Sequence, residues 1–297
     1  MSEGITHTAI VDDCARLALA SSKVCEAFKK ALTDHLDMAR LGGITRHGDR
    51  HNVALLASFR EQWPPADEND TVPRKLAFVL GWLSHRAADR TMKKVFRDLD
   101  GDCAESPRDC SVYNDACVLR EVYGGGDPFS YVANEAGLKD HPGARGTNVA
   151  EAEDLFCAMW RRMLVRMHTF IPDDADAEAW LEKVAQTQQR LYVDLKRYAA
   201  AYASPDPDKW KRFITDANFY DKDDAIVRVA RSLQNGESRS SADVDAAMDD
   251  PGNESRYAYM LKRAFGYCLA ASAWFEKKIT EDEVNQRLEI GRPELSG

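Results

Sequence analysis

KLAFVLGWLSHRAADRTMKKVFRD (residues 75–98) places apolar side chains at the three- and four-residue intervals of an amphipathic helix. Thr71, followed by Pro73 in the first turn, is typical of a helix start, and the pattern continues to about Asp98. We therefore expect a long helix over 72–99. Its buried face would consist of Leu76, Val79, Leu80, Leu83, Ala87, Met92 and Phe96.

Helical periodicity extends over most of the chain, and no segment alternates convincingly with the two-residue period of a strand. Thr6 and Ser22 are the expected N-caps of the first two helices, and Gly42–Gly43 is the expected end of the second. Residues 127–147 and 235–253 read as loops. The fold class that follows is all-α, a multi-helix bundle. Its other predicted helices cover 7–20, 23–41, 52–63, 107–123, 148–170, 175–203, 206–216, 221–234, 254–278 and a short segment after Thr280, where Glu283 completes a capping box.

The composition is that of a globular protein. The chain has 297 residues, 44% of them hydrophobic, which is enough to bury a sizeable core. No apolar stretch is long enough to span a membrane. Met1–Asp12 has neither a basic region nor an apolar run, so no export signal is expected. The seven cysteines are scattered without CxxC spacing, as in proteins that keep reduced thiols, and we expect a cytoplasmic protein.

The net charge of −9 argues against binding to long nucleic acid, which requires a broad basic surface. A small anionic substrate at a metal site is compatible with this charge, because local charge can outweigh the global balance. The sequence gives no indication of the oligomeric state.

His85 and Asp89 lie four residues apart on the expected helix over 72–99 and so project from one face of it. A helix is stiff, so two ligands at this spacing converge on one ion without the ordering of a loop. Imidazole with carboxylate suits zinc or another divalent first-row metal. The alternative is a histidine that is simply hydrogen-bonded to a carboxylate one turn away. Gly81, one turn before His85, leaves room for a metal, a ligand or a closely packed helix.

Further candidate ligands lie on both sides of this helix. His7 falls in the first turn of the first helix, and Asp49 and His51 belong to TRHGDRH, just before the helix at 52–63. Each also has an ordinary interpretation, as a surface residue or part of a solvated turn. The remaining candidates, which could equally be polar residues of an exposed helix face, are Asn114, Asp115 and Glu121.

The order of these groups resembles the zinc-dependent phospholipase C family, which shares its helical fold with a class of single-strand nucleases. THTAIVDDCARLAL (6–19) resembles the helix with an early histidine, and LAFVLGWLSHRAADR (76–90) resembles the HxxxD helix. DCSVYNDACVLREVYGGGDPF (109–129) is similar to the next helix of the family. The resemblance covers roughly residues 5–130 and implies a cluster of up to three zinc ions that activate water for attack on a phosphodiester.

The chain departs from the family pattern at several positions. Lys93 occupies a position that often carries a further histidine, and Asn114 replaces an expected histidine. One turn on, Val118 is not an acidic ligand, although Glu121 could reach the same face. In the secreted members of the family the free amino terminus is a ligand, a role that Met1 would not take here. With these departures a complete three-metal cluster is not expected, and the alternatives are one or two divalent ions, or none.

Two hypotheses follow. The first is an intracellular, metal-dependent hydrolase of a phosphoester, with His7, His85 and Asp89 as the central ligands. His51 would be a further ligand and Asp49 the catalytic residue. The second is a relative that has lost the metal cluster and acts as a non-catalytic helical binding or regulatory protein. In both, a single helical domain over 1–297 is expected, with the metal site in 5–130 and a C-terminal helical half over 148–290.

Overall fold

The predicted long helix is present as α5 (Val72–Asp100). All seven residues of its predicted apolar face are buried, each less than a tenth exposed. The structure is a computed structural model that describes residues 4–44, 52–67, 70–101, 108–124, 197–198 and 200–290.

Helices and no strand are present in those described ranges, which confirms the all-α fold class and the multi-helix bundle. None of the described helices is long and apolar enough to cross a membrane. The predicted helix at 148–170, most of that at 175–203 and the loop at 127–147 lie outside the described residues. The other elements are α1 (Gly4–Ala20), α2 (Glu26–Asp34), α3 (Leu36–Ile44), α4 (Asn52–Glu61), α6 (Asp109–Glu121), α9 (Pro207–Trp210), the π-helix η2 (Lys211–Thr215), α10 (Ala225–Gln234), α11 (Ser241–Asp249), α12 (Arg256–Phe275) and α13 (Glu281–Arg287).

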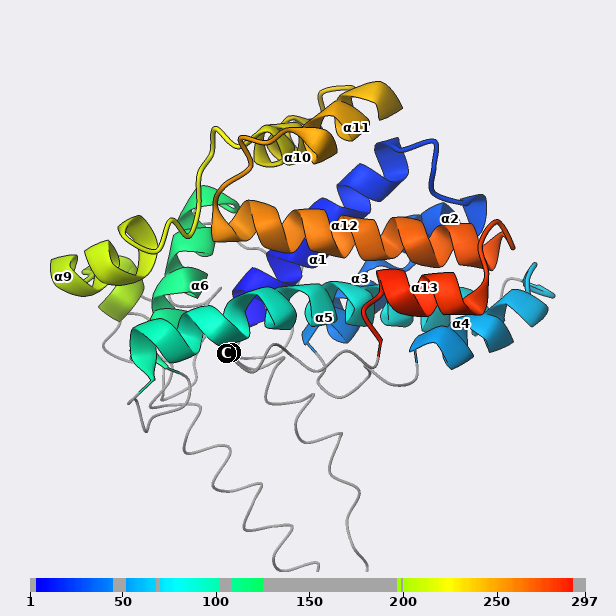
Figure 1. Cartoon of the computed structure of the whole chain (residues 1–297), viewed down its shortest axis with the longest axis horizontal. Helices are drawn as coiled ribbons and strands as arrows, with labels where there is room; N and C mark the ends of the chain where they lie inside the picture. Colours follow the sequence, from blue (N-terminus) through cyan, green and yellow to red (C-terminus); the bar gives the residue numbers. More distant parts are fainter. Residues whose placement is uncertain are drawn as a thin grey trace, which may run out of the picture. The chain divides into compact units, whose positions relative to one another are not determined.

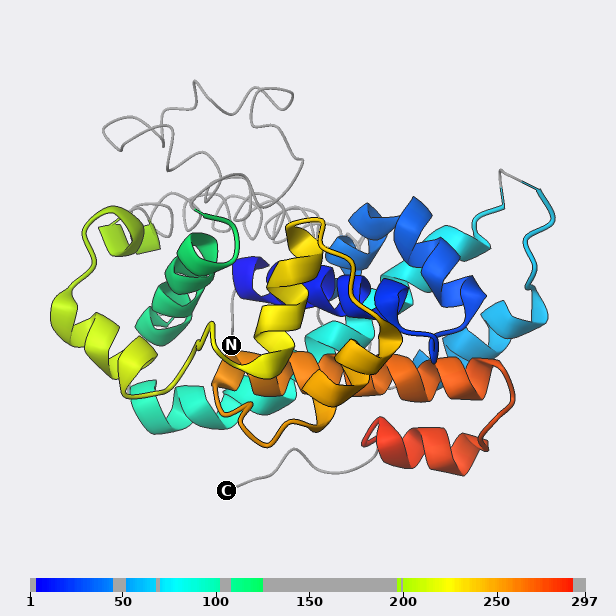
Figure 2. The same ribbon diagram turned by 90° about the horizontal axis from the view of Figure 1, so that it is seen from above.

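The chain divides into two compact units. Unit 1 contains Met1–Thr6 and Leu99–Asp216, and unit 2 contains His7–Asp98 and Ala217–Gly297. Unit 2 therefore draws on both of the halves expected from the sequence. Within it, α12 runs beside α5 (Figures 1 and 2), and the Arg263 guanidinium donates to the Thr91 hydroxyl at 3.2 Å. Helix α13 packs against α12 and α4, and α10 packs against α11 and α12.

Helix α1 lies in the interior of unit 2 and is buried on every face from His7 to Ala15. A helix in such a position must pair its polar side chains with partners on other helices. Two fully buried carboxylates of α1 have such partners. Asp12 accepts a forked pair of hydrogen bonds from Arg40 of α3, and Asp13 pairs with Arg231 of α10 and with the hydroxyl of Tyr257 of α12.

Glycines allow α3 and α5 to cross with their backbones in direct contact. A Cβ atom placed on Gly81 would lie 1.9 Å from the carbonyl oxygen of Ala39, and one on Gly42 would lie 2.0 Å from that of Phe78. The expectation that Gly42–Gly43 end a helix is therefore wrong, because both residues lie inside α3. Their lack of a side chain serves helix packing, as was one expectation for Gly81.

Four other expectations are corrected. The helix expected over 23–41 is broken at His35 into α2 and α3, and Ser22 is not its N-cap, because α2 begins at Glu26. The loop expected over 235–253 contains α11, which begins with a capping box in which the Ser240 and Asp243 side chains bond reciprocally to backbone N–H groups. Thr6 is not an N-cap, because α1 already begins at Gly4. The capping box at Thr280 and Glu283 is present as expected.

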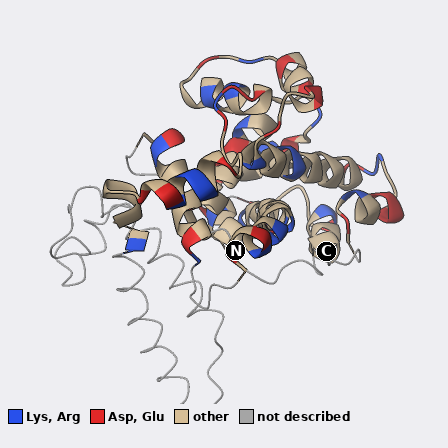
Figure 3. Cartoon of the chain, turned by 60° about the vertical axis from the view of Figure 1, so that its left-hand side comes forward, with Lys and Arg blue, Asp and Glu red and all other residues tan. Residues whose placement is uncertain are grey.

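Charged residues of both signs lie along the described helices (Figure 3). Lys30 pairs with Asp34 on α2 at 2.7 Å, for example. The absence of binding to long nucleic acid remains a prediction from the net charge.

In unit 1, Asp115 of α6 takes the capping role that was assigned to Thr6. Its carboxylate accepts hydrogen bonds from the Thr6 amide at 2.7 Å and the Thr6 hydroxyl at 2.5 Å. The Ile5 amide at 3.4 Å and the Tyr198 hydroxyl at 3.1 Å also donate to it. Because the first N–H groups of a helix have no partner within it, a distant carboxylate stabilises the start of α1.

We expect Asp115→Ala to lower the free energy of unfolding by about 2–3 kcal/mol, because it leaves buried donors on Ile5, Thr6 and Tyr198 unsatisfied. The effect is measured by urea denaturation at pH 7. The matched control is Glu121→Ala, which changes an exposed carboxylate on the same helix and should leave the stability nearly unchanged. Equal stability of Asp115→Ala and the parent would show that this cap is dispensable.

The pH dependence of the free energy of unfolding provides a second test of Asp115. Burial raises the pKa of Asp115 from 3.8 to about 6, against the hydrogen bonds from Thr6 and Tyr198 that lower it. The folded state therefore binds the proton more tightly than the unfolded state. The parent should gain stability relative to Asp115→Asn as the pH falls from 6 towards 4, and lose it again as the pH rises through 6.

Candidate metal centre

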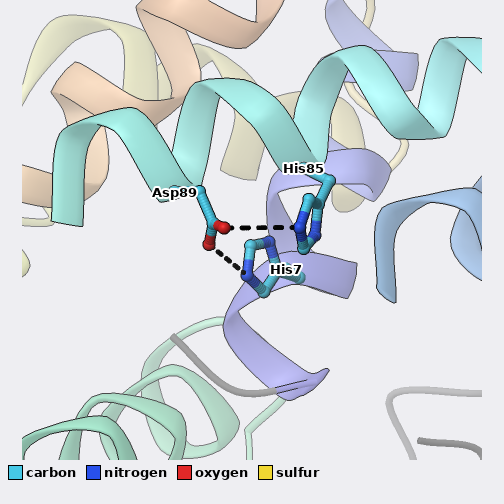
Figure 4. A group of neighbouring side chains, drawn as sticks. All are labelled: His7, His85 and Asp89. Atoms are coloured by element: carbon cyan, nitrogen blue, oxygen red, sulfur yellow. Dashed lines mark ion pairs between the residues drawn. The ribbon is translucent and has the colours of Figure 1, made fainter. Parts of the chain in front are cut away.

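Three of the predicted ligands come together in unit 2. His85 and Asp89 project from the same face of α5, and His7 approaches them from α1 (Figure 4). We call these residues the His–Asp–His cluster. One ligand atom from each can be chosen so that all three lie within 4.8 Å of one another, so the cluster could hold a metal ion.

Each carboxylate oxygen of Asp89 faces one imidazole. His7 Nε2 lies 3.4 Å from Oδ1, and His85 Nε2 lies 3.5 Å from Oδ2. Direct charge-assisted hydrogen bonds between such groups are shorter, about 2.7–2.9 Å. Two ligands of a tetrahedral ion with bonds of about 2.0–2.1 Å are separated by about 3.3 Å. The two separations end at different oxygens of Asp89, so each is compatible with two ligands of one ion and also with a long hydrogen bond between the histidine and the carboxylate.

The two imidazole rings are stacked, with centroids 4.3 Å apart and an angle of 21° between their planes. Two neutral rings beside one carboxylate are the form that a metal ion requires.

Asp89 is ionised in this setting. Burial by itself would raise its pKa, but the His7 and His85 rings beside the carboxylate outweigh burial and hold the pKa well below the ordinary value of 3.8. The cluster thus offers one negative charge and two imidazole nitrogens.

The cluster is close to the surface but not open to it. His7 and His85 are 4% and 6% exposed, and the Asp89 side chain is 14% exposed. An ion held by these groups would be largely shielded from solvent.

His85 has a further contact that was not expected from the sequence. Its Nδ1 lies 2.9 Å from the carbonyl oxygen of Gly43 in α3. Sequence reasoning missed this contact because a backbone carbonyl has no signature in the sequence. The usable signal was the pair Gly42–Gly43 inside a helical pattern, with Gly81 on the helix of His85.

Six other residues were predicted to belong to the site. Two of them, Asp49 and His51, lie outside the described residues. Asn114, Asp115 and Glu121 belong to unit 1, where Asp115 caps α1 and Glu121 is exposed. Asn114 is buried, and its amide nitrogen lies 3.9 Å from Cys110 Sγ. Lys93 is partly exposed, one turn after Asp89 on α5. The parts that these six residues play in a metal site remain predictions.

Comparison with protein-family models, with curated proteins and with solved structures finds no match to this chain. The resemblance to zinc-dependent phospholipases C therefore remains an expectation that is based on the residues quoted above.

Proposed function

We propose that this protein is a metal-dependent hydrolase of phosphoesters whose divalent ion is bound by the His–Asp–His cluster. The observation that supports this proposal most strongly is the spacing within the cluster. One ligand atom from each of the three residues can be chosen so that all lie within 4.8 Å of one another, and the Asp89–His7 and Asp89–His85 separations of 3.4 and 3.5 Å are compatible with ligands of one ion.

The donor set fits such an ion chemically. Two imidazoles and one carboxylate are typical ligands of zinc and of other first-row metals. Three protein ligands leave at least one coordination position free, as in catalytic zinc sites. A bound divalent ion would polarise a phosphoryl oxygen and lower the pKa of a water molecule.

Each residue has a different role in the proposed metal site. The single negative charge of Asp89 leaves a divalent site with net positive charge, which favours an anionic substrate. His7 and His85 join α1 to α5 through one ion, so that binding also fixes the contact between these helices. Asp49 and His51 are proposed to complete the site, as expected from the sequence.

The test is hydrolysis of a panel of phosphodiesters and phosphomonoesters with added zinc, cobalt or manganese. We expect hydrolysis that a chelator abolishes and that Asp89→Asn reduces by about 100-fold or more, since the amide keeps the shape but loses the charge. Asp98→Asn is the matched control, because Asp98 lies on the same helix with an exposed side chain. Turnover that is insensitive to the chelator or to Asp89→Asn would contradict the proposal. Metal binding without turnover of any ester would favour the non-catalytic alternative.

A further inference from the structure

Gly43 lies between the two helices that carry the His–Asp–His cluster. A Cβ atom on Gly43 would lie 2.4 Å from Val11 Cγ2 and 3.7 Å from the carbonyl oxygen of His7, both on α1. On its other side, the carbonyl oxygen of Gly43 lies 2.9 Å from His85 Nδ1 on α5. The residue therefore contacts α1 and α5 at the level of the two histidines.

The contact with His85 has a fixed polarity. A carbonyl oxygen can only accept, so the hydrogen of this bond belongs to Nδ1 of His85. The other ring nitrogen, Nε2, is then the atom that faces Asp89, 3.5 Å from Oδ2. A neutral ring with its proton on Nδ1 has a lone pair on Nε2, directed at a position next to the carboxylate. A cation at this position satisfies both groups.

Gly43 belongs to α3, and its carbonyl oxygen is directed at His85 of α5. The close crossing of α3 and α5 at Gly42 and Gly81 brings the carbonyl within reach of the ring.

We propose that the Gly43 carbonyl is a positioning group that holds the proton on Nδ1 of His85 and so makes Nε2 the metal-binding atom. This inference rests on the proposed metal site. It adds that the contact between α3 and α1 at Gly43 and Val11 controls the affinity of this site, although neither residue binds the ion. Partners of this kind typically change metal affinity by about 10–100-fold.

The structure offers a substitution that perturbs the contact and a second one that repairs it. In Gly43→Ala the new methyl group would collide with Val11 Cγ2, which is on a buried, β-branched side chain with little freedom to rotate. Val11→Ala removes this atom, and the remaining neighbours of the methyl group, at 3.6 and 3.7 Å, are at ordinary contact distances. The double variant should therefore return α3 to its place.

The measurement is the zinc or cobalt affinity of four proteins: the parent, Gly43→Ala, Val11→Ala and the double variant. We expect Gly43→Ala to bind about 10-fold more weakly or worse, and the double variant to regain an affinity within about 3-fold of that of Val11→Ala. Gly266→Ala is the control for adding a methyl group to a helical glycine, since nothing lies within 4 Å of its Cβ position. Unchanged affinity in a folded Gly43→Ala would overturn the inference.

A second measurement decides the question if Gly43→Ala does not fold. In the cadmium-loaded, ¹⁵N-labelled parent protein, we expect the metal to couple to Nε2 of His85 and the Nδ1 proton to be visible and slow to exchange. Coupling to Nδ1 would overturn the inference and leave the metal site standing. A parent protein that binds no zinc, cobalt or cadmium would overturn both the inference and the proposed function.

Discussion

Protein purified without chelator should carry about one equivalent of divalent metal, and His85→Ala, Asp89→Ala and His7→Ala should each abolish its retention. Each variant removes one of three ligands, so we expect the affinity to fall by about 100-fold or more. The chain should stay folded, because Ala is the residue best tolerated in a helix and all three positions are helical. Elemental analysis with circular dichroism on the same samples measures both results.

His35→Ala is the matched control, since His35 lies at the end of α2 with a partly exposed side chain and should leave the metal content unchanged. The parent should also bind the ion more weakly in acid, because metal ligands bind only in their deprotonated forms. The prediction fails if the parent contains no metal and His85→Ala is only less stable, by about 1–3 kcal/mol. The cluster would then be a hydrogen-bonded one.

Gly81→Leu should prevent folding or lower the free energy of unfolding by more than about 3 kcal/mol. The first atom of the new side chain would lie 1.9 Å from the carbonyl oxygen of Ala39 and 2.8 Å from the amide nitrogen of Gly43. Both are backbone atoms, so no change of rotamer relieves the clash and the two helices must separate. Urea denaturation followed by circular dichroism measures the loss.

Gly266→Ala, a substitution at a helical glycine without close neighbours, should have the opposite effect. Gly266 lies inside α12 with open space around its Cβ position, so Ala should stabilise the protein by about 0.5–1 kcal/mol. If Gly81→Leu were as stable as the parent, α3 and α5 would not cross as closely as described.

The elements that the sequence predicts well are those with local causes. The apolar face of α5, the i, i+4 spacing of His85 and Asp89 and the capping box of α13 each depend on residues a few positions apart. A local pattern fixes such features before any long-range contact forms.

The incorrect expectations have causes that are distant in sequence. The first turn of α1 is capped by Asp115, more than a hundred residues from Thr6, so the local N-cap signal was misleading. Gly42–Gly43 has the appearance of a helix end unless Gly81 is known to lie opposite. Helix α11 was not predicted because its sequence is polar and acidic and its buried face consists of Val244 and Ala247 alone. The proximity of His7 to His85 could be predicted only from the family resemblance. The two residues lie on different helices, and no local sequence pattern predicts that α1 packs against α5.

Helix α1 is synthesised long before the residues that pair with its buried side chains. Asp13 finds Arg231 and Tyr257 only after more than two hundred further residues have been made. Most of the stability of a helix in a protein comes from tertiary packing, and burial of Asp13 is costly when Arg231 and Tyr257 are absent and Arg16 is the partner that remains. A nascent chain or a fragment that ends before α10 would thus contain His7, His85 and Asp89 and still lack the support that holds α1 in place. Metal binding by the cluster, as proposed above, would then be a late, post-translational event, and a fragment that ends before α10 should retain no metal although it contains His7, His85 and Asp89.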